Sequence, residues 1–332
     1  MIVHISKNLS ESEVHSLAAD NKAAWYESSE HYIFILPSAI KVLPQSLEKC
    51  AIDSWALADD IQLASKTYRS EIREVSWAQT VTGGNTNNTV MIAGPCSVES
   101  EEQLELTAQL LIEQGIKNLR AGAFKPRTSP YTFQGLGLEG LKMLDKIRSK
   151  YGFGIITEVR DATNVEAIIE YADVIQIGAK SMYDHGILKR CGQARKPVLL
   201  KRGFGSTLQE LVQCAEFILS AGNEQVMLCE RGIRTFETKT RFTLDLCGVA
   251  YLKEHTNLPV ILDPSHAMGL AYGVPDLARA CVAMGVDGLL VETHPNPSVA
   301  KSDAAQQLNY QVFRDMMKTL NPIATAVGRK MV

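Results

Sequence analysis

The stretch Pro259-Val260-Ile261-Leu262-Asp263-Pro264-Ser265-His266 shows the pattern that decides the fold. A short apolar run, typical of a buried strand, ends directly in an aspartate and is followed by a histidine. Similar runs cover residues 90–93, 118–123, 154–158, 174–178, 197–201, 226–230 and 288–292. Strands that are covered on both faces are apolar along their whole length, so the pattern indicates a buried parallel sheet of eight strands.

The segments between these runs have helical spacing of apolar residues, as in 103–114 and 208–219. Strands that alternate with helices indicate βαβ units, and eight units over about 230 residues predict a (β/α)8 TIM barrel. An open doubly wound sheet is the competing arrangement, but its site gathers at one switch point. We favour the barrel because nearly every run ends in residues that can do chemistry.

The residues before position 90 differ in composition, since they hold all three tryptophans. Strand-like runs at 2–5, 23–27, 32–36 and 52–57 alternate with a helix that starts after Ser10 and a second helix over 38–47. The order βαββαβ predicts a small α+β domain of the ferredoxin-like kind. We therefore expect this domain over residues 1–70, a linker or short β-hairpin over 71–89, and the barrel over 90–332.

Composition and charge exclude several classes of protein. The 332 residues are 45% hydrophobic and 21% charged, as in globular proteins, and the net charge is −3. Such a chain has no overall excess of positive charge that would bind nucleic acid or an anionic membrane. The start resembles no signal peptide, and no apolar run approaches the ~18 residues of a membrane helix. Seven scattered cysteines without a Cys-x-x-Cys motif indicate a reducing compartment, so we expect a cytoplasmic protein.

Four residues with metal-binding side chains follow the strands that meet at one barrel mouth. Cys96, His266 and Glu292 end the first, seventh and eighth predicted strands, and Asp303 lies in the next loop. Taken singly, such residues are more often a buried thiol or a hydrogen-bonded loop residue. Together they predict a divalent metal site, and the thiolate and imidazole favour Zn, Fe, Co or Mn over Mg.

Cations end four of the other predicted strands, although the protein is mildly acidic. At one mouth they would recognise phosphate and carboxylate groups. The candidates are Arg120, Lys125, Arg127, Lys180, Lys201 and Arg231, with hydroxyl donors from Thr128 and Ser129. Arg202 and Arg234 are weaker candidates for this role.

Long motifs add a family resemblance to this interpretation. They are Ala93-Gly94-Pro95-Cys96-Ser97, Lys125-Pro126-Arg127-Thr128-Ser129-Pro130, Lys196-Pro197-Val198-Leu199-Leu200-Lys201-Arg202-Gly203, Cys229-Glu230-Arg231-Gly232-Ile233-Arg234, Asp263-Pro264-Ser265-His266 and Glu292-Thr293-His294-Pro295. From about Val90 to Phe313 the chain resembles the 3-deoxy-D-arabino-heptulosonate 7-phosphate (DAHP) synthases of the short type I β class. Members of this family are TIM barrels, some with an N-terminal ferredoxin-like domain.

The resemblance implies that phosphoenolpyruvate and erythrose 4-phosphate condense at the barrel mouth, the first step of the shikimate pathway. The implied metal ligands are Cys96, His266, Glu292 and Asp303. Arg120, Lys125, Lys201 and Arg231 would hold phosphoenolpyruvate, with Lys180 near its phosphate. Arg127, Thr128 and Ser129 would hold the aldose phosphate, and Lys125 could also move a proton. The N-terminal domain would bind Phe or Tyr as feedback inhibitor, and the chain would form a homo-oligomer, a tetramer or dimer.

Two departures from the family pattern keep alternatives open. Lys180 stands where the family usually has Arg, and residues 267–272 lack two arginines that are frequent there. A related synthase that joins phosphoenolpyruvate to another phosphorylated aldose is therefore the main alternative, although Lys125–Ser129 favours the heptulosonate branch over the octulosonate 8-phosphate synthases. A Schiff-base aldolase using Lys201 and a catalytically weak sensor of aromatic metabolites are further alternatives. The complete ligand set argues against the sensor.

Overall fold

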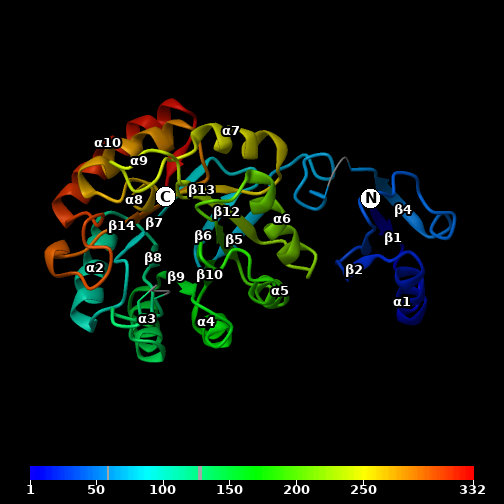
Figure 1. Ribbon diagram of the computed structural model, residues 1–332, viewed down its shortest axis with the longest axis horizontal. Helices are drawn as coiled ribbons and strands as arrows, with labels where there is room; N and C mark the ends of the chain where they lie inside the picture. The colour runs from blue at the N-terminus through cyan, green and yellow to red at the C-terminus, as the bar shows by residue number, and fades with distance from the viewer. Residues whose placement is uncertain (58–59, 126–128) are drawn as a thin grey trace.

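A closed barrel of eight parallel strands forms the larger part of the computed structural model, which describes residues 1–57, 60–125 and 129–332 (Figure 1). Each barrel strand pairs with the next, and the last pairs with the first. In chain order the strands are β7 (Asn88–Gly94), β8 (Asn118–Arg120), β9 (Gly154–Val159), β10 (Val174–Ile177), β11 (Val198–Lys201), β12 (Val226–Glu230), β13 (Val260–Leu262) and β14 (Gly288–Glu292). The predicted TIM barrel is confirmed, and the open doubly wound sheet is excluded.

Helices surround the barrel and follow its strands in the expected order. They are α2 (Glu101–Glu113), α3 (Leu138–Tyr151), α4 (Val165–Tyr171), α5 (His185–Gln193), α6 (Leu208–Leu219), α7 (Leu246–His255), α8 (Pro264–Met268), α9 (Val274–Ala283) and α10 (Tyr310–Ala326). Asp263 caps α8 and Pro264 occupies its first turn, a combination that starts a helix directly at a strand end. Among the described residues, no helix has the length and apolar character needed to cross a lipid bilayer.

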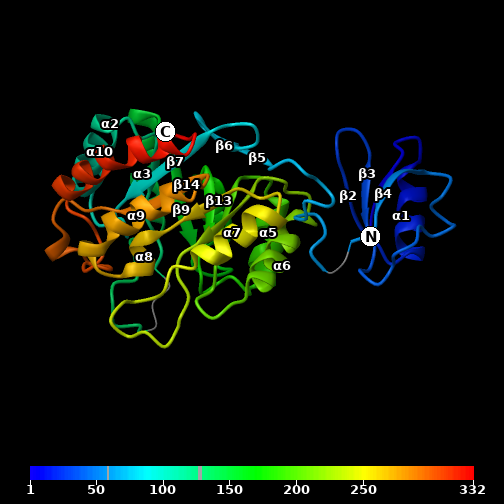
Figure 2. The same cartoon turned by 90° about the horizontal axis from the view of Figure 1, so that it is seen from above.

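A hairpin closes the end of the barrel opposite to the loops that follow the strands (Figure 2). It consists of β5 (Glu74–Trp77) and β6 (Thr80–Gly83). Val75 and Trp77 pack against inward-facing strand residues such as Ile92, and the Trp77 indole donates to Asn118 Oδ1 at 2.8 Å. A Cβ at Gly154 would lie 2.7 Å from the Trp77 ring, so glycine is needed where the hairpin crosses β9. This end of the barrel is an apolar floor.

The N-terminal domain is a four-stranded antiparallel sheet with one helix, α1 (Glu11–Asp20). Its strands β1 (Ile2–Ile5), β2 (Ala24–Glu27), β3 (Tyr32–Ile35) and β4 (Ala51–Trp55) lie in the order β2-β3-β1-β4, as in a ferredoxin-like fold. The helix predicted over 38–47 is wrong, because these residues form turns. Pro44 lacks an N–H group and clashes with the preceding turn of a helix, which disfavours a helix through this segment.

Buried charges attach the linker between domain and barrel to the outer face of the barrel, where the N-terminal domain lies beyond α6 (Figure 1). Glu216 of α6 accepts hydrogen bonds from the backbone N–H groups of residues 62–64 at 2.7, 3.1 and 2.8 Å. The Arg73 guanidinium donates to Asn257 Oδ1 at 2.9 Å and lies 3.1 Å from Glu224 Oε2. We call Arg73, Glu216, Glu224 and Asn257 the junction cluster.

Candidate active site

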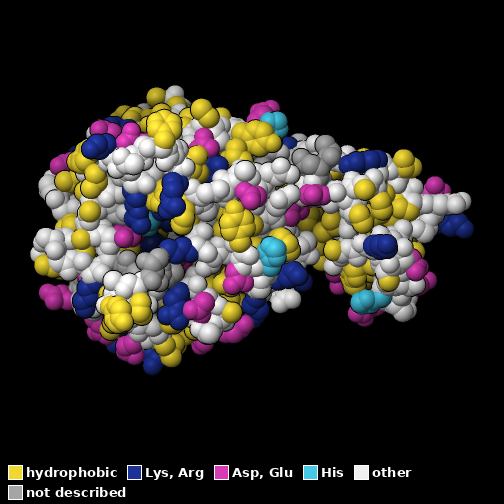
Figure 3. Space-filling model, in the orientation of Figure 1, with side chains coloured by type: hydrophobic (Ala, Val, Ile, Leu, Met, Phe, Trp, Pro, Cys, Tyr) yellow, Lys and Arg dark blue, Asp and Glu magenta, His cyan; other side chains and the backbone are white. Residues whose placement is uncertain are grey.

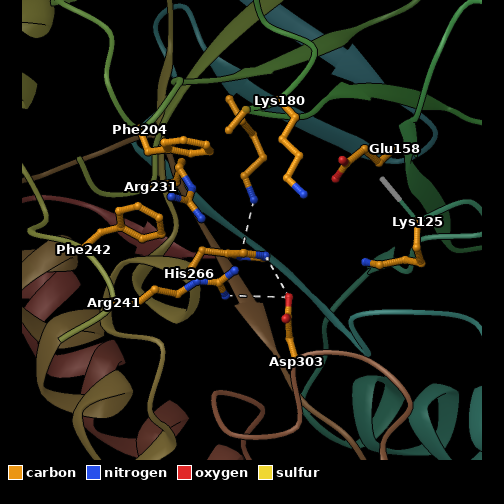
Figure 4. A pocket seen from close by; sticks show the side chains of 11 residues that line it. Lys125, Glu158, Lys180, Phe204, Arg231, Arg241, Phe242, His266 and Asp303 are labelled. Atoms are coloured by element: carbon orange, nitrogen blue, oxygen red, sulfur yellow. Dashed lines mark hydrogen bonds and ion pairs between the residues drawn. The ribbon is translucent and has the colours of Figure 1, made fainter. Parts of the chain in front are cut away.

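The loops after the barrel strands surround a hollow that is ringed by Lys and Arg side chains (Figure 3). The side chains that line this cavity follow seven successive strands, from β8 to β14. They include five cations, two carboxylates, a histidine and two aromatic rings (Figure 4): Lys125, Glu158, Lys180, Lys201, Phe204, Arg231, Arg241, Phe242, His266 and Asp303. One end of the barrel therefore brings together reactive side chains that are spread along the sequence from Lys125 to Asp303.

Three of the four predicted metal ligands lie together beside this cavity, where Asp303 lines its wall and Cys96 contacts Lys125. Cys96, Glu292 and Asp303 each offer one ligand atom, and these atoms lie within 4.8 Å of one another. The fourth predicted ligand, His266, has its Nε2 at 3.6 Å from Glu292 Oε1 and 3.9 Å from Asp303 Oδ2. A thiol, an imidazole and two carboxylates are the donors that Mn, Fe, Co and Zn accept, so these residues fit such an ion.

The opposite edge of the His266 ring is held by a carboxylate that the sequence interpretation left without a role. His266 Nδ1 lies 2.7 Å from Asp263 Oδ2, which also accepts from Lys201 Nζ at 2.5 Å. Burial would raise the pKa of Asp263, but His266 and Lys201 hold it well below its ordinary value. Burial lowers the pKa of His266 despite the opposing pull of Asp263. Because the Asp263 carboxylate faces Nδ1, it favours a proton on Nδ1 and leaves Nε2 available as a ligand.

Glu292 is fully buried and held on both oxygens. Arg120 donates to Oε1 at 2.7 Å, and Gln306 Nε2 donates to Oε2 at 2.6 Å. Burial would raise the pKa of Glu292, but His266 and Arg120 lower it below its ordinary value. An ionised carboxylate with a fixed orientation is what a metal ligand requires.

The Cys96 thiol is enclosed by the protein and faces Lys125. Burial, followed by the nearby Glu292, raises the pKa of Cys96 to about 12. Lys125 Nζ lies 3.1 Å from the sulfur and 3.0 Å from the Cys96 carbonyl oxygen. Because thiolate, and not thiol, binds metal, the thiol would lose its proton only as a cation binds. Asp303, which completes the site, has a left-handed backbone with φ of 47°, uncommon for a non-glycine residue.

The structure places most of the predicted anion-binding cations on the cavity wall. Lys125, Lys180, Lys201 and Arg231 line it, and the Arg231 guanidinium lies 4.3 Å from the centre of the Phe242 ring. Burial lowers the pKa of Arg231. Arg120 lies behind the metal ligands rather than on the wall.

The other residues predicted to bind anions do not line the cavity in the described part of the structure. Ser129 is not on the cavity wall, and its Oγ accepts from the Tyr131 N–H at 3.3 Å. Arg127 and Thr128 lie outside the described residues. Arg202 is a structural residue, since it is buried and binds Glu230 and Asp245, each at 2.8 Å.

Several residues of the site were not singled out from the sequence. Glu158 ends β9 on the cavity wall and accepts from Gln176 at 2.6 Å, so the rule that picked the other strand ends could have found it. Arg241 and Gln306 lie in long loops, away from any strand end, and no local pattern marks them. They enter the site only because their loops fold back over the mouth.

Comparisons with known proteins agree with this geometry. The family described as the DAHP synthetase I family matches residues 65–328. A phospho-2-dehydro-3-deoxyheptonate aldolase of Thermotoga maritima is 47% identical over 240 residues, which cover 72% of this chain and 71% of that protein. A 2-dehydro-3-deoxyphosphooctonate aldolase of Acidithiobacillus ferrooxidans is 32% identical over 251 residues, covering 70% and 88%.

A solved structure extends the similarity to the N-terminal domain. The crystal structure of the DAHP synthase of Thermotoga maritima superposes with a TM-score of 0.81 at 38% identity, covering 100% of this chain and 99% of that one. The family match spans well over half of the sequence, and the superposition covers the barrel and the N-terminal domain. The chain belongs to the DAHP synthetase I family.

Proposed function

We propose that this chain condenses phosphoenolpyruvate with erythrose 4-phosphate and water to give DAHP and phosphate, the first step of the shikimate pathway. The observation that carries the proposal is the juxtaposition of a metal donor set with a cation-lined cavity. Cys96 Sγ lies 3.1 Å from Lys125 Nζ, and Lys125 shares the cavity wall with Lys201 and Arg231. Such a cavity suits two phosphorylated, strongly anionic substrates.

The cations would bring the two anions side by side. Lys125, Lys201 and Arg231 would hold the carboxylate and phosphate of phosphoenolpyruvate, with Lys180 near the phosphate and Arg120 behind. Arg120 Nε and Arg231 Nε are buried and, within the described residues, have no hydrogen-bond partner. Buried donors without a partner carry a free-energy cost that an anionic ligand would remove. Arg127, Thr128 and Ser129 remain the proposed contacts of the aldose phosphate.

A divalent ion of Mn, Fe, Co or Zn, held by Cys96, His266, Glu292 and Asp303, would act as Lewis acid toward the aldehyde oxygen. C3 of phosphoenolpyruvate attacks the aldehyde carbon, and the positive charge that develops at C2 is quenched by water. The C–O bond to phosphate then breaks, and inorganic phosphate leaves. The cations offset the repulsion between the substrates and orient C3 toward the aldehyde.

Lys125 is the proposed proton carrier of the site. Burial would lower the pKa of Lys125, but the nearby Cys96 and Glu158 raise it above its ordinary value. Lys125 is therefore an ammonium group at neutral pH. It would give a proton to the aldehyde oxygen as C3 attacks the aldehyde carbon, and it would recover a proton from the water that adds at C2.

Phosphate release from phosphoenolpyruvate and erythrose 4-phosphate, with and without a chelator, tests this function. We expect turnover that the chelator abolishes and a divalent ion restores. A panel of aldose phosphates tests the main alternative, which the phosphooctonate relative and Lys180 favour. Release only with an aldose other than erythrose 4-phosphate would establish that alternative instead. Activity that survives the chelator, with a substrate trapped on Lys201 by borohydride, would establish the Schiff-base aldolase.

We also propose that the N-terminal domain regulates the barrel by binding Phe or Tyr, in a cytoplasmic homo-oligomer. Removal of residues 1–60 tests the regulation and leaves the β5–β6 hairpin, which belongs to the barrel core. We expect the shortened chain to turn over without inhibition by either amino acid. Equal inhibition of the full and shortened chains would contradict a regulatory domain, as would a full chain that ignores both amino acids.

A further inference from the structure

Gln306 uses both ends of its side-chain amide in the candidate metal site. The residue is 1% exposed, and its Nε2 donates to Glu292 Oε2 at 2.6 Å. Its Oε1 accepts from Arg241 Nη1 at 2.7 Å. Gln306 thus connects a buried ligand carboxylate with a cation on the cavity wall.

The two partners permit only one orientation of this amide. A guanidinium only donates hydrogen bonds, and an ionised carboxylate only accepts them. Arg241 must therefore face the amide oxygen, and the amide NH2 group must face Glu292. Both partners therefore favour the same orientation, and loss of Arg241 would remove one of the two contacts that hold the amide in it.

Arg241 reaches this position because of the loop that passes under it. Its backbone N–H donates to the Met268 carbonyl at 3.2 Å, and its Nη1 lies 3.8 Å from Asp303 Oδ2 (Figure 4). A Cβ at Gly269, where φ is +72°, would lie 2.4 Å from the Arg241 Cβ. The altered segment 267–272 keeps a glycine at the one position where a side chain would displace Arg241.

We propose that Gln306 is a positioning residue of the metal centre and that Arg241 holds its amide in the orientation that Glu292 requires. Arg120 donates to one oxygen of Glu292 and Gln306 donates to the other. The two hydrogen bonds hold the carboxylate in one orientation relative to the other three proposed ligands. The proposal rests on the proposed function, because it assumes that Cys96, His266, Glu292 and Asp303 bind a metal ion.

Binding of Co²⁺ to the metal-free full chain tests the proposal without any substrate. The readout is the cobalt–thiolate absorption of Cys96, followed as Co²⁺ is added. Gln306→Met keeps the length of the side chain and removes both hydrogen bonds, so we expect Co²⁺ to bind about 10- to 100-fold more weakly. Gln311→Met is the matched control, since Gln311 is exposed on α10 and bonds only to Asp315 in the described contacts. The control should bind Co²⁺ like the natural chain.

Arg241→Met provides a second variant with less risk to folding, because this side chain is 41% exposed. We expect a weaker loss of Co²⁺ affinity, of a few-fold, and no further loss when it is combined with Gln306→Met. Affinity of Gln306→Met within twofold of the natural chain would overturn the proposal, as would additive losses in the double variant. If the natural chain bound no Co²⁺, the proposed metal centre itself would be wrong. The proposed function is tested separately, by phosphate release from the natural chain.

Discussion

The mouth of the barrel and the junction cluster both bury arginine beside glutamate, but they differ in how completely these groups are paired. Arg73 Nε and Nη2 donate to Asn257 and Leu63, each at 2.9 Å, and Nη1, although it lacks a hydrogen bond, lies 3.1 Å from Glu224 Oε2. Glu216 accepts three backbone N–H groups of the linker. At the mouth, Arg231 Nε lacks a hydrogen bond among the described residues, and there Arg231 has no carboxylate at ion-pair distance either.

The difference separates a structural cluster from a binding site. A buried charge costs free energy unless its hydrogen bonds are satisfied within the protein, by water or by a ligand. The junction cluster turns its charged side chains toward one another and toward the linker backbone, and so holds the linker against the barrel. The mouth keeps donors and carboxylates incompletely paired around a cavity, which is the arrangement expected where ligands complete the set. Substitutions at the mouth should therefore change activity, and those at the junction should change stability.

The largest effect is expected from Cys96→Ser at the mouth. Loss of a metal-ligating thiolate should lower turnover by more than about 100-fold. This is more than the loss expected when a residue that only hydrogen-bonds to a ligand is removed. The unfolding midpoint of the metal-free chain should change little, because the natural thiol is there a neutral buried group. Steady-state kinetics and thermal unfolding check both parts, with Cys247→Ser, at an exposed position, as control. Full activity of Cys96→Ser in a metal-free assay would refute the ligand role.

Arg73→Met is expected to give the converse result at the junction. It removes the hydrogen bonds of Arg73 to Asn257 Oδ1 and the Leu63 carbonyl and its ion pair with Glu224, so it should lower the free energy of unfolding by about 2–4 kcal/mol. Activity per folded molecule should stay within about threefold. The control is Arg69→Met, because Arg69 pairs with the same Glu224 at 3.7 Å but is 39% exposed, and should cost less than about 1 kcal/mol. Similar losses in the two variants, measured by urea unfolding, would remove the distinction between the two regions.

Glu216 predicts a pH dependence of the junction. Burial raises the pKa of Glu216 to about 7, although the hydrogen bonds from the backbone N–H groups of residues 62–64 act to lower it. The folded state thus holds the proton more tightly than the unfolded state, whose carboxyl has an ordinary pKa near 4.5. This contribution to stability is complete below about pH 4.5 and is lost as the pH rises through 7, by on the order of 3 kcal/mol. Urea unfolding between pH 5 and 8 should show a flatter profile for Glu216→Gln, and equal slopes would contradict the prediction.

Lys180→Arg should have the smallest effect. Lys180 is exposed on the cavity wall, where Arg could bind a phosphate through two parallel hydrogen bonds. If Lys180 contacts the phosphate, the KM for phosphoenolpyruvate should fall by a few-fold, while the unfolding midpoint stays the same. Lys189→Arg on α5 is a control outside the cavity. An unchanged KM would place Lys180 outside the phosphate site.

Local sequence patterns were enough to predict the barrel and most of the residues that line its mouth. A buried parallel strand must be apolar along its length, and the polar residue that ends it is then exposed at one edge, so strand ends such as Glu292 and Lys201 could be identified locally. The same reasoning failed for residues 38–47, where the apolar spacing of a helix was outweighed by the missing N–H group of Pro44.

The partners of the charged residues depend on the tertiary fold and could not be predicted from local sequence. Arg202 and Arg231 both follow apolar strands, yet one is bonded within the protein and the other faces the cavity. Gln306 and Arg241 are 65 positions apart and meet because two loops fold over the mouth. A local pattern reports which face of an element is buried, whereas a hydrogen-bond partner depends on chain paths that converge from distant positions.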